Sequence, residues 1–349
     1  MMSGASRAAS CHRLACAFIA GSSFLLIAGF GFGAAVAADA PRDWLDRMAD
    51  APDHVSYRGT LIHMCGGKVD IVEVVHRVED GRITERVKSL DADGREIIRN
   101  AEEVMCILPD QETVLVGSKK AAGHADRFLE VSVSFANVND TNYRLQTLAR
   151  EHVAGRAAEV VAIRPIDDYR FGYRLWIDHE HALPLKYELL DERGDAIEQT
   201  LYTQISFAGG IDEAEVEPTV VMDNFVWQHS GEVASGAATE ASRPVDESAA
   251  QGWRVDEMPS GFELVAVETA SAGDSGMVHL VYSDGLASVS VFIETESDES
   301  ERQAGASEMG AMNAYTTMVD EYLVTAVGGV PLRTTMMMAL SVARTPVDR

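Results

Sequence analysis

The stretch YRGTLIHMCGGKVDIVEVVHRVEDGRITERVKSLDADGREIIR, residues 57–99, decides the fold. Its strand-forming runs are separated by Gly66-Gly67, by Asp80-Gly81 and by Asp93-Gly94. Gly-Gly and Asp-Gly pairs between such runs are typical of tight hairpin turns. The pattern continues further along the chain, so residues 57–117 are predicted to form an antiparallel meander in which each strand pairs with the next.

Further strands and one helix are expected around this meander. The strands are predicted at residues 160–164, 172–177, 185–190 and 200–207, whereas residues 118–150 are less regular. A short amphipathic helix is expected between residues 39 and about 52, because Trp44, Leu45 and Met48 fall on one helical face. The first part of the chain should therefore be a large, highly curved sheet with a helical cover.

A change in composition after Asn224 divides the chain. Residues 228–251 are rich in Ser, Ala, Gly and Glu, and such a sequence buries too little apolar surface to order itself, which predicts a flexible linker. Residues 252–349 hold two hairpin signals and then, after Pro331, a helix with apolar residues at four-residue spacing. A small α+β domain is expected there, and α+β is the predicted class of the whole chain.

The N-terminus predicts the compartment. Residues 1–13 carry two arginines and no acid, residues 14–38 carry no charge, and the stretch ends in Ala35-Val36-Ala37-Ala38. A basic start, an apolar middle and a small-residue end are typical of a secretory signal peptide. Residues 1–38 are therefore expected to be cleaved and the rest to be periplasmic, with an uncleaved membrane anchor as the alternative.

The charge of the remaining chain excludes some partners. Without residues 1–38, which hold Arg7 and Arg13 but no acid, it has 27 basic and 55 acidic residues, a net charge of −28. Such a surplus repels nucleic acid and anionic head groups, so no nucleic-acid partner is predicted. Residues 252–349 have 5 basic and 15 acidic residues, which favours a partner segment that carries Arg or Lys.

Two cysteines, Cys65 and Cys106, remain after the signal peptide is removed. Disulfides persist in an oxidising compartment, but a bridge needs Cα atoms within about 7 Å of each other. A disulfide between these two residues and two separate half-buried thiols are both compatible with the sequence.

No set of residues in the sequence indicates catalysis. Gly-x-Ser-x-Gly, Ser-x-x-Lys and P-loop patterns are absent from the secreted part. His179 and His181, beside Asp178 and Glu180, are the best metal candidates by their spacing. A polar hairpin turn explains the same residues more simply, so neither a metal nor a cofactor is predicted.

Several segments together resemble the RseB/MucB family of periplasmic regulators. They include Val-His-Arg-Val at 75–78, Asp-Tyr-Arg-Phe-Gly-Tyr-Arg-Leu-Trp-Ile-Asp at 168–178, Val-Tyr-Ser-Asp-Gly-Leu at 281–286 and Val-Gly-Gly-Val-Pro at 327–331. The likeness runs in order over nearly the whole chain after residue 38.

The resemblance implies a non-enzymatic regulator with two domains. Residues 39–227 would be similar to the LolA/LolB lipoprotein carriers, a large half-open antiparallel β-barrel with helical cover. Residues 252–349 and the interdomain cleft would hold the periplasmic segment of a membrane-spanning anti-sigma factor of the RseA/MucA kind. In a sigma-E-type envelope stress response this would shield that factor from proteolysis until lipid or lipopolysaccharide causes release. A periplasmic carrier of lipid or lipoprotein is the alternative function.

Candidate contact residues follow from this resemblance. A polyanionic lipid would have to approach through an arginine-bearing rim, and the ligand candidates are Arg77, Arg82, Arg86 and Arg99. Solvated cross-strand pairing with glutamates is the alternative role for these arginines. The partner candidates are strand residues that would also suit a core: Tyr282, Leu286, Tyr315 and Tyr322. Homo-oligomer formation is left open.

Overall fold

The structure is a computed structural model that describes residues 40–91, 93–118, 135, 137–207, 209–229, 250–272, 275–295 and 304–344. The predicted signal peptide and most of the predicted linker lie outside these residues. Below, the large-sheet module means the described residues 40–229, and the small-sheet module means the described residues 250–344. In the part of the chain that the structure describes, no helix is long and apolar enough to cross a membrane.

The large-sheet module is built on one thirteen-stranded sheet. Its strands are β1 (Tyr57–Cys65), β2 (Lys68–Glu79), β3 (Arg82–Ser89), β4 (Glu96–Arg99), β5 (Glu103–Leu108), β6 (Thr113–Ser118), β7 (Tyr143–Thr147), β8 (Glu151–Val153), β9 (Arg156–Pro165), β10 (Gly172–Asp178), β11 (Pro184–Leu190), β12 (Ala196–Ser206) and β13 (Val226–His229). The strand order is β13-β6-β5-β4-β3-β2-β1-β12-β11-β10-β9-β7, and β8 also pairs with β9. The meander predicted for residues 57–117 is confirmed as β1 to β6.

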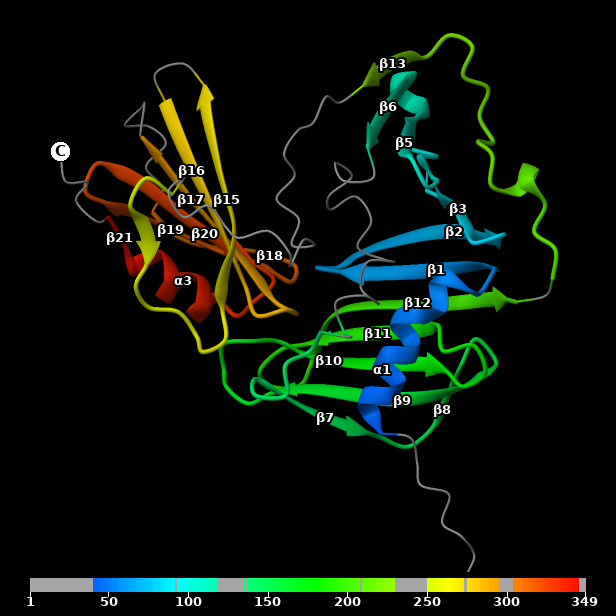
Figure 1. Cartoon of the computed structure of the whole chain (residues 1–349), viewed down its shortest axis with the longest axis horizontal. Helices are drawn as coiled ribbons and strands as arrows, with labels where there is room; N and C mark the ends of the chain where they lie inside the picture. Colours follow the sequence, from blue (N-terminus) through cyan, green and yellow to red (C-terminus); the bar gives the residue numbers. More distant parts are fainter. Residues whose placement is uncertain are drawn as a thin grey trace, which may run out of the picture. The chain divides into compact units, whose positions relative to one another are not determined.

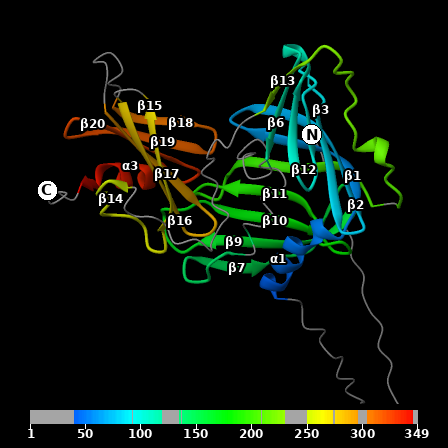
Figure 2. The ribbon, with the colours of Figure 1, turned by 45° about the horizontal axis from the view of Figure 1, so that its top comes forward.

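The sheet is strongly curved, but it is not closed into a barrel (Figures 1 and 2). Closure requires hydrogen bonds between the two edge strands. Among the described strands β13 pairs only with β6, in parallel, and β7 pairs only with β9. The predicted antiparallel sheet is thus confirmed apart from the parallel β13–β6 pair, whereas the barrel is not.

Helix α1 (Pro41–Asp50) covers one face of this sheet and is followed by the short 3-10 helix η1 (Ala51–Asp53). Figure 1 shows α1 lying across β9 to β12. Its residues Trp44, Leu45 and Met48 are buried in the same apolar cluster as Tyr57 and Leu61 of β1, as the amphipathic pattern predicted. Because side chains alternate along a strand, this cluster occupies the α1 face of the sheet.

A segment that we call the strap, residues 209–225, lies against the other face. It follows β12, includes the 3-10 helix η3 (Glu213–Glu215) and leads into β13, and it passes beside β1 to β3 (Figure 2). Ile211 and Val216 of the strap pack on Val75 of β2, which alternation places opposite the α1 face. A further 3-10 helix, η2 (Pro109–Gln111), connects β5 to β6.

The small-sheet module combines a six-stranded antiparallel sheet, a two-stranded sheet and one helix. The elements are β14 (Trp253–Val255), β15 (Glu263–Ala272), β16 (Ser275–Ser283), β17 (Ser288–Thr295), β18 (Gly305–Met309), β19 (Met312–Val319), β20 (Tyr322–Gly328), α3 (Leu332–Leu340) and β21 (Val342–Arg344). The larger sheet has the order β15-β16-β17-β20-β19-β18, and β14 pairs with β21. Both predicted hairpins and the helix after Pro331 are confirmed, and Met338 of α3 packs in the core with Val291 and Ala326.

Candidate functional site

A buried arginine of the large-sheet module makes the most extensive polar contacts to the small-sheet module. Arg170 lies in the loop between β9 and β10 and is only 1% exposed. Its Nε donates a hydrogen bond to Oδ2 of Asp284 at 2.5 Å, and its Nη2 donates to the carbonyl oxygen of Ser260. Its Nη1 donates to Asp167 of the same loop. Three acceptors from three segments therefore surround one guanidinium.

Asp284 serves two purposes at once. In the turn between β16 and β17, its Oδ1 accepts the backbone N–H groups of Leu286 at 3.0 Å and Ala287 at 2.8 Å. An aspartate that bonds its own backbone in this way stabilises a turn. Its Oδ2 faces the large-sheet module, where it accepts hydrogen bonds from Arg170 and from the hydroxyl of Tyr143, the latter at 2.9 Å.

Aromatic rings enclose this ion pair. The guanidinium carbon of Arg170 lies 5.0 Å from the ring centroid of Phe262 and 5.8 Å from that of Tyr143, within the range of cation–π attraction. Burial and then the charge of Asp284 raise the pKa of Tyr143, so its hydroxyl stays protonated and acts as a donor. We call Arg170, Asp284 and Tyr143 the pin.

Weaker contacts surround the pin. The hydroxyl of Thr334 donates to the carbonyl oxygen of Tyr169 at 2.7 Å. Arg333, whose side chain is half exposed, lies 3.5 Å from Asp168 and 3.4 Å from Glu192. Apolar packing adds to these contacts, because Ala311 of the small-sheet module shares a cluster with Phe171 and Leu189.

A second contact joins two hairpin turns. The turn between β1 and β2 meets the turn between β18 and β19, where a Cβ added to Gly310 would lie 2.5 Å from Sγ of Cys65. Gly310 also has a φ of +62°, so a side chain is excluded there both by space and by backbone conformation. Cys65 therefore lies directly against the small-sheet module.

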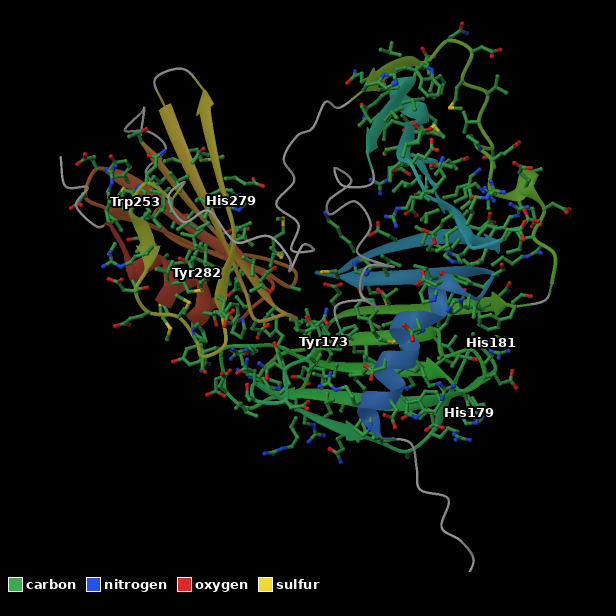
Figure 3. The ribbon with its side chains drawn as sticks, viewed as in Figure 1. Tyr173, His179, His181, Trp253, His279 and Tyr282 are labelled. Carbon is green, nitrogen blue, oxygen red and sulfur yellow. The ribbon has the colours of Figure 1, made fainter. Side chains whose placement is uncertain are left out.

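The partner candidates are only partly gathered at this interface. Leu286 packs against the apolar cluster of the large-sheet module. Tyr282 is buried inside the small-sheet module, where its hydroxyl accepts the backbone N–H of Val255 at 3.1 Å (Figure 3). Tyr315 and Tyr322 are partly buried and pack against that same core, so three of the four candidates contact the core of the small-sheet module.

The four ligand candidates do not form one patch. Arg77 and Arg86 hold the strap, because their Nε atoms donate to the carbonyl oxygens of Ile211 at 3.0 Å and Glu215 at 2.8 Å. Arg99 lies on the α1 face, 3.5 Å from Glu85. Arg82 is exposed where β3 begins. Cross-strand pairing also occurs, since Arg86 of β3 lies 2.8 Å from Glu73 of β2, whereas Arg77 pairs with Glu79 of its own strand.

A buried histidine pairs with a glutamate on the α1 face. Nδ1 of His76 lies 3.1 Å from Oε1 of Glu85, and its Nε2 lies 2.8 Å from the carbonyl oxygen of Pro52. The ring stacks on Tyr57 with centroids 4.9 Å apart. Burial lowers the pKa of His76, but the bonds to Glu85 and Pro52 outweigh it, so the pKa is raised overall.

The two histidines that were the metal candidates pair with neighbouring carboxylates. His179 and His181 lie beyond the end of β10 that is away from Tyr173 (Figure 3), and they pair with Glu159 and Asp178, each at 3.1 Å. Within the described residues no group of His, Cys, Asp and Glu could hold a metal ion.

Both remaining cysteines are free thiols. Cys65 lies on β1 and Cys106 on β5, with β2, β3 and β4 between them in the sheet, so nothing in the described fold supports a bridge.

Both parts of the chain match domains of one known protein family. A family model of the MucB/RseB N-terminal domain matches residues 40–220, and one of the MucB/RseB C-terminal domain matches residues 247–343. The sigma factor AlgU regulatory protein MucB of Pseudomonas aeruginosa is 30% identical, over 92% of this chain and 96% of its own. The sigma-E factor regulatory protein RseB of Haemophilus influenzae is 24% identical, over 83% and 87%.

Solved structures of MucB are also similar to this chain. MucB in complex with MucA(peri) has a TM-score of 0.65 and 28% identity, covering 88% of this chain and all of that one. A crystal structure of MucB has a TM-score of 0.52 and 27% identity, covering 87% and 97%.

Proposed function

The chain belongs to the MucB/RseB family, and from this premise we propose that it regulates a sigma factor by binding the periplasmic segment of an anti-sigma factor. The observation that carries the proposal is the match of both family domains, in order, to a chain whose relatives are named as sigma-factor regulators. One of those relatives, MucB, has been solved with MucA(peri).

On this proposal the chain is a secreted, non-enzymatic protein with two domains. Residues 1–38 are the cleaved signal peptide, and the two domains are residues 39–227 and 252–349. The linker lies within residues 228–251, of which 228–229 still belong to β13. The regulatory names of the relatives support a non-enzymatic role. The charge of the smaller domain, with 5 basic and 15 acidic residues, supports a partner segment that carries Arg or Lys.

On this proposal, release of the anti-sigma factor is triggered by lipid or lipopolysaccharide, which the larger domain binds inside a half-open barrel. The large sheet is strongly curved, and its α1 face is apolar. A ligand shifts an equilibrium between two arrangements only by the difference between its affinities for them. Bound lipid therefore favours an arrangement of the domains that holds the partner weakly. Of the four ligand candidates, Arg82 is the exposed one and is therefore the most accessible to an acidic head group.

Binding and protection together test this proposal. The full secreted chain is mixed with the purified periplasmic segment of the anti-sigma factor from the same genome, and affinity is measured by calorimetry. A complex should form, and the segment should resist a site-specific protease only in its presence. The contribution of opposite charges is tested by raising the salt concentration, which should weaken a complex that depends on them. Absence of a complex at tens of micromolar would contradict the proposal.

A further inference from the structure

The pin joins two charges that are hidden from water. The side chains of Arg170 and Asp284 are both 0% exposed, although the residues are 114 positions apart in the sequence. Removing an ion from water is costly, and a buried pair is stable only while its partners stay in place. Separation of the modules would expose both charges to water, so the pair is favourable in one arrangement and dispensable in the other.

The geometry of the pin also restricts orientation. The guanidinium is a planar fork whose donors point in fixed directions. Here it reaches the turn at Asp284 and the backbone at Ser260 together, while Asp167 holds it on its own loop. A rotation of the small-sheet module would break both bonds at once. The surrounding pair between Arg333 and Asp168 is largely exposed and contributes little to this selection.

We infer that Arg170 and Asp284 are positioning residues, which fix the arrangement of the two modules that binds the partner with high affinity. This inference rests on the function proposed above, and the partner itself does not have to touch the pin. The direction of the effect follows from the comparisons, because this pinned chain is more similar to MucB in complex with MucA(peri), at a TM-score of 0.65, than to MucB alone, at 0.52.

The chain contains its own reporter of this arrangement. Cys65 lies against Gly310, so separation of the modules at this point exposes the thiol. Cys106 instead packs against the apolar cluster of the large-sheet module, and burial raises its pKa, which slows its reaction. The ratio of the two labelling rates separates opening of the interface from a general loss of stability, which would expose both thiols.

Asp284→Asn is the sharpest variant. The remaining Oδ1 still accepts the two backbone N–H groups of the turn, while an amide NH₂ replaces Oδ2 and faces the donors of Arg170 and Tyr143. The turn is therefore preserved and the pin alone is broken. Arg333→Gln is the matched control, because it removes exposed ion pairs at the same interface.

The experiment labels the full secreted chain with a water-soluble maleimide and measures its affinity for the anti-sigma segment. Asp284→Asn should raise the labelling rate of Cys65 at least fivefold, change that of Cys106 less than twofold, and weaken the partner at least tenfold. Arg333→Gln should change all three less than twofold. Should Asp284→Asn not fold, Tyr143→Phe removes one hydrogen bond to the same carboxylate and should act in the same direction, by two- to fivefold.

Two results overturn the inference: an unchanged Cys65 rate in a folded pin variant, or an exposed Cys65 with unchanged partner affinity. Failure of the wild-type chain to bind the segment is a different outcome. It removes the proposed function and with it the role of the pin in binding, whereas the labelling rates still report whether the pin holds the modules together.

Discussion

The pin predicts an asymmetric double-mutant cycle. When Asp284 is changed to Asn, Arg170 keeps two acceptors, the carboxylate of Asp167 and the carbonyl oxygen of Ser260. When Arg170 is changed to Met, the buried Oδ2 of Asp284 keeps only the hydroxyl of Tyr143. The arginine substitution therefore leaves the less compensated charge, and it should be the more harmful of the two.

The expected losses of unfolding free energy depend on which of these partners remain. Removing one member of a buried ion pair costs about 3–5 kcal/mol, which is the expectation for Arg170→Met. Loss of a hydrogen bond to a charged group costs about 1.5–3 kcal/mol, which is the expectation for Asp284→Asn. The double variant has no fully buried carboxylate without its arginine, because Asp167, which also loses Arg170, is partly exposed. Its cost should therefore be smaller than the sum by at least about 1.5 kcal/mol.

Urea unfolding followed by tryptophan fluorescence measures these free energies by linear extrapolation. A variant at the exposed pair, Arg333→Gln, should lose less than about 0.5 kcal/mol. The reasoning is refuted if Asp284→Asn costs as much as Arg170→Met, or if the two substitutions add. Additive costs would mean that the two charges do not interact in the folded protein.

Three further predictions concern the large-sheet module. The raised pKa of His76 stabilises the fold below the unfolded pKa of 6.5, and this contribution is lost as pH rises through the folded pKa; His76→Gln should flatten that part of the melting-temperature profile. Leu45→Ala should cost about 2–5 kcal/mol in urea unfolding, against less than about 0.5 kcal/mol for the exposed Asp46→Ala. Glu96 accepts hydrogen bonds from the backbone N–H and the hydroxyl of Thr219 in the strap; burial raises the pKa of Glu96, but these bonds and Lys88 outweigh burial and lower it overall. Ionised Glu96 therefore stabilises the fold above the unfolded pKa of 4.5, and this contribution is lost as pH falls through the folded pKa. Glu96→Gln should remove this acid-dependent loss of stability. If His76→Gln and Glu96→Gln had the same dependence of melting temperature on pH as the wild-type protein, both assignments would be wrong.

Local patterns in the sequence were sufficient for the meander and for α1. The glycines at 66–67, 81 and 94 have positive φ angles in the structure, so the turns were readable from residue type alone. The helix was readable because Trp44, Leu45 and Met48 repeat with the helical period. In both cases the deciding interactions join residues close together in the chain.

Contacts between distant segments were not readable in this way. Residues 228–229, predicted to begin the linker, belong to β13 because they pair in parallel with β6, more than 100 positions earlier. Arg77 and Arg86 were candidates for ligand binding, but they bond backbone carbonyl oxygens of the strap, and a carbonyl oxygen leaves no mark in a side-chain pattern.

Arg170 was missed for the same reason. Arginine is almost never fully buried unless it is paired, and the residues that pair with it across the interface lie 90 and 114 positions away. Both halves of the contact stood within segments that carried the family resemblance, residues 168–178 and 281–286. That coincidence was the one available signal, and it indicated membership of a family without indicating which side chains meet.

The strength of the pin suits a device that must hold its partner and also release it. A tenfold loss of affinity requires about 1.4 kcal/mol of coupling, which lies at the lower end of what one charged hydrogen bond contributes. Burial of one methylene contributes about 0.8 kcal/mol, so a lipid that buries a few more methylenes in the open arrangement offsets the pin. A hydrophobic interface of larger area would need a larger ligand contribution to open. The small, buried, strongly directional contact at Arg170 instead makes one arrangement specific, and on the proposed lipid trigger its opening stays within reach of a single acyl chain.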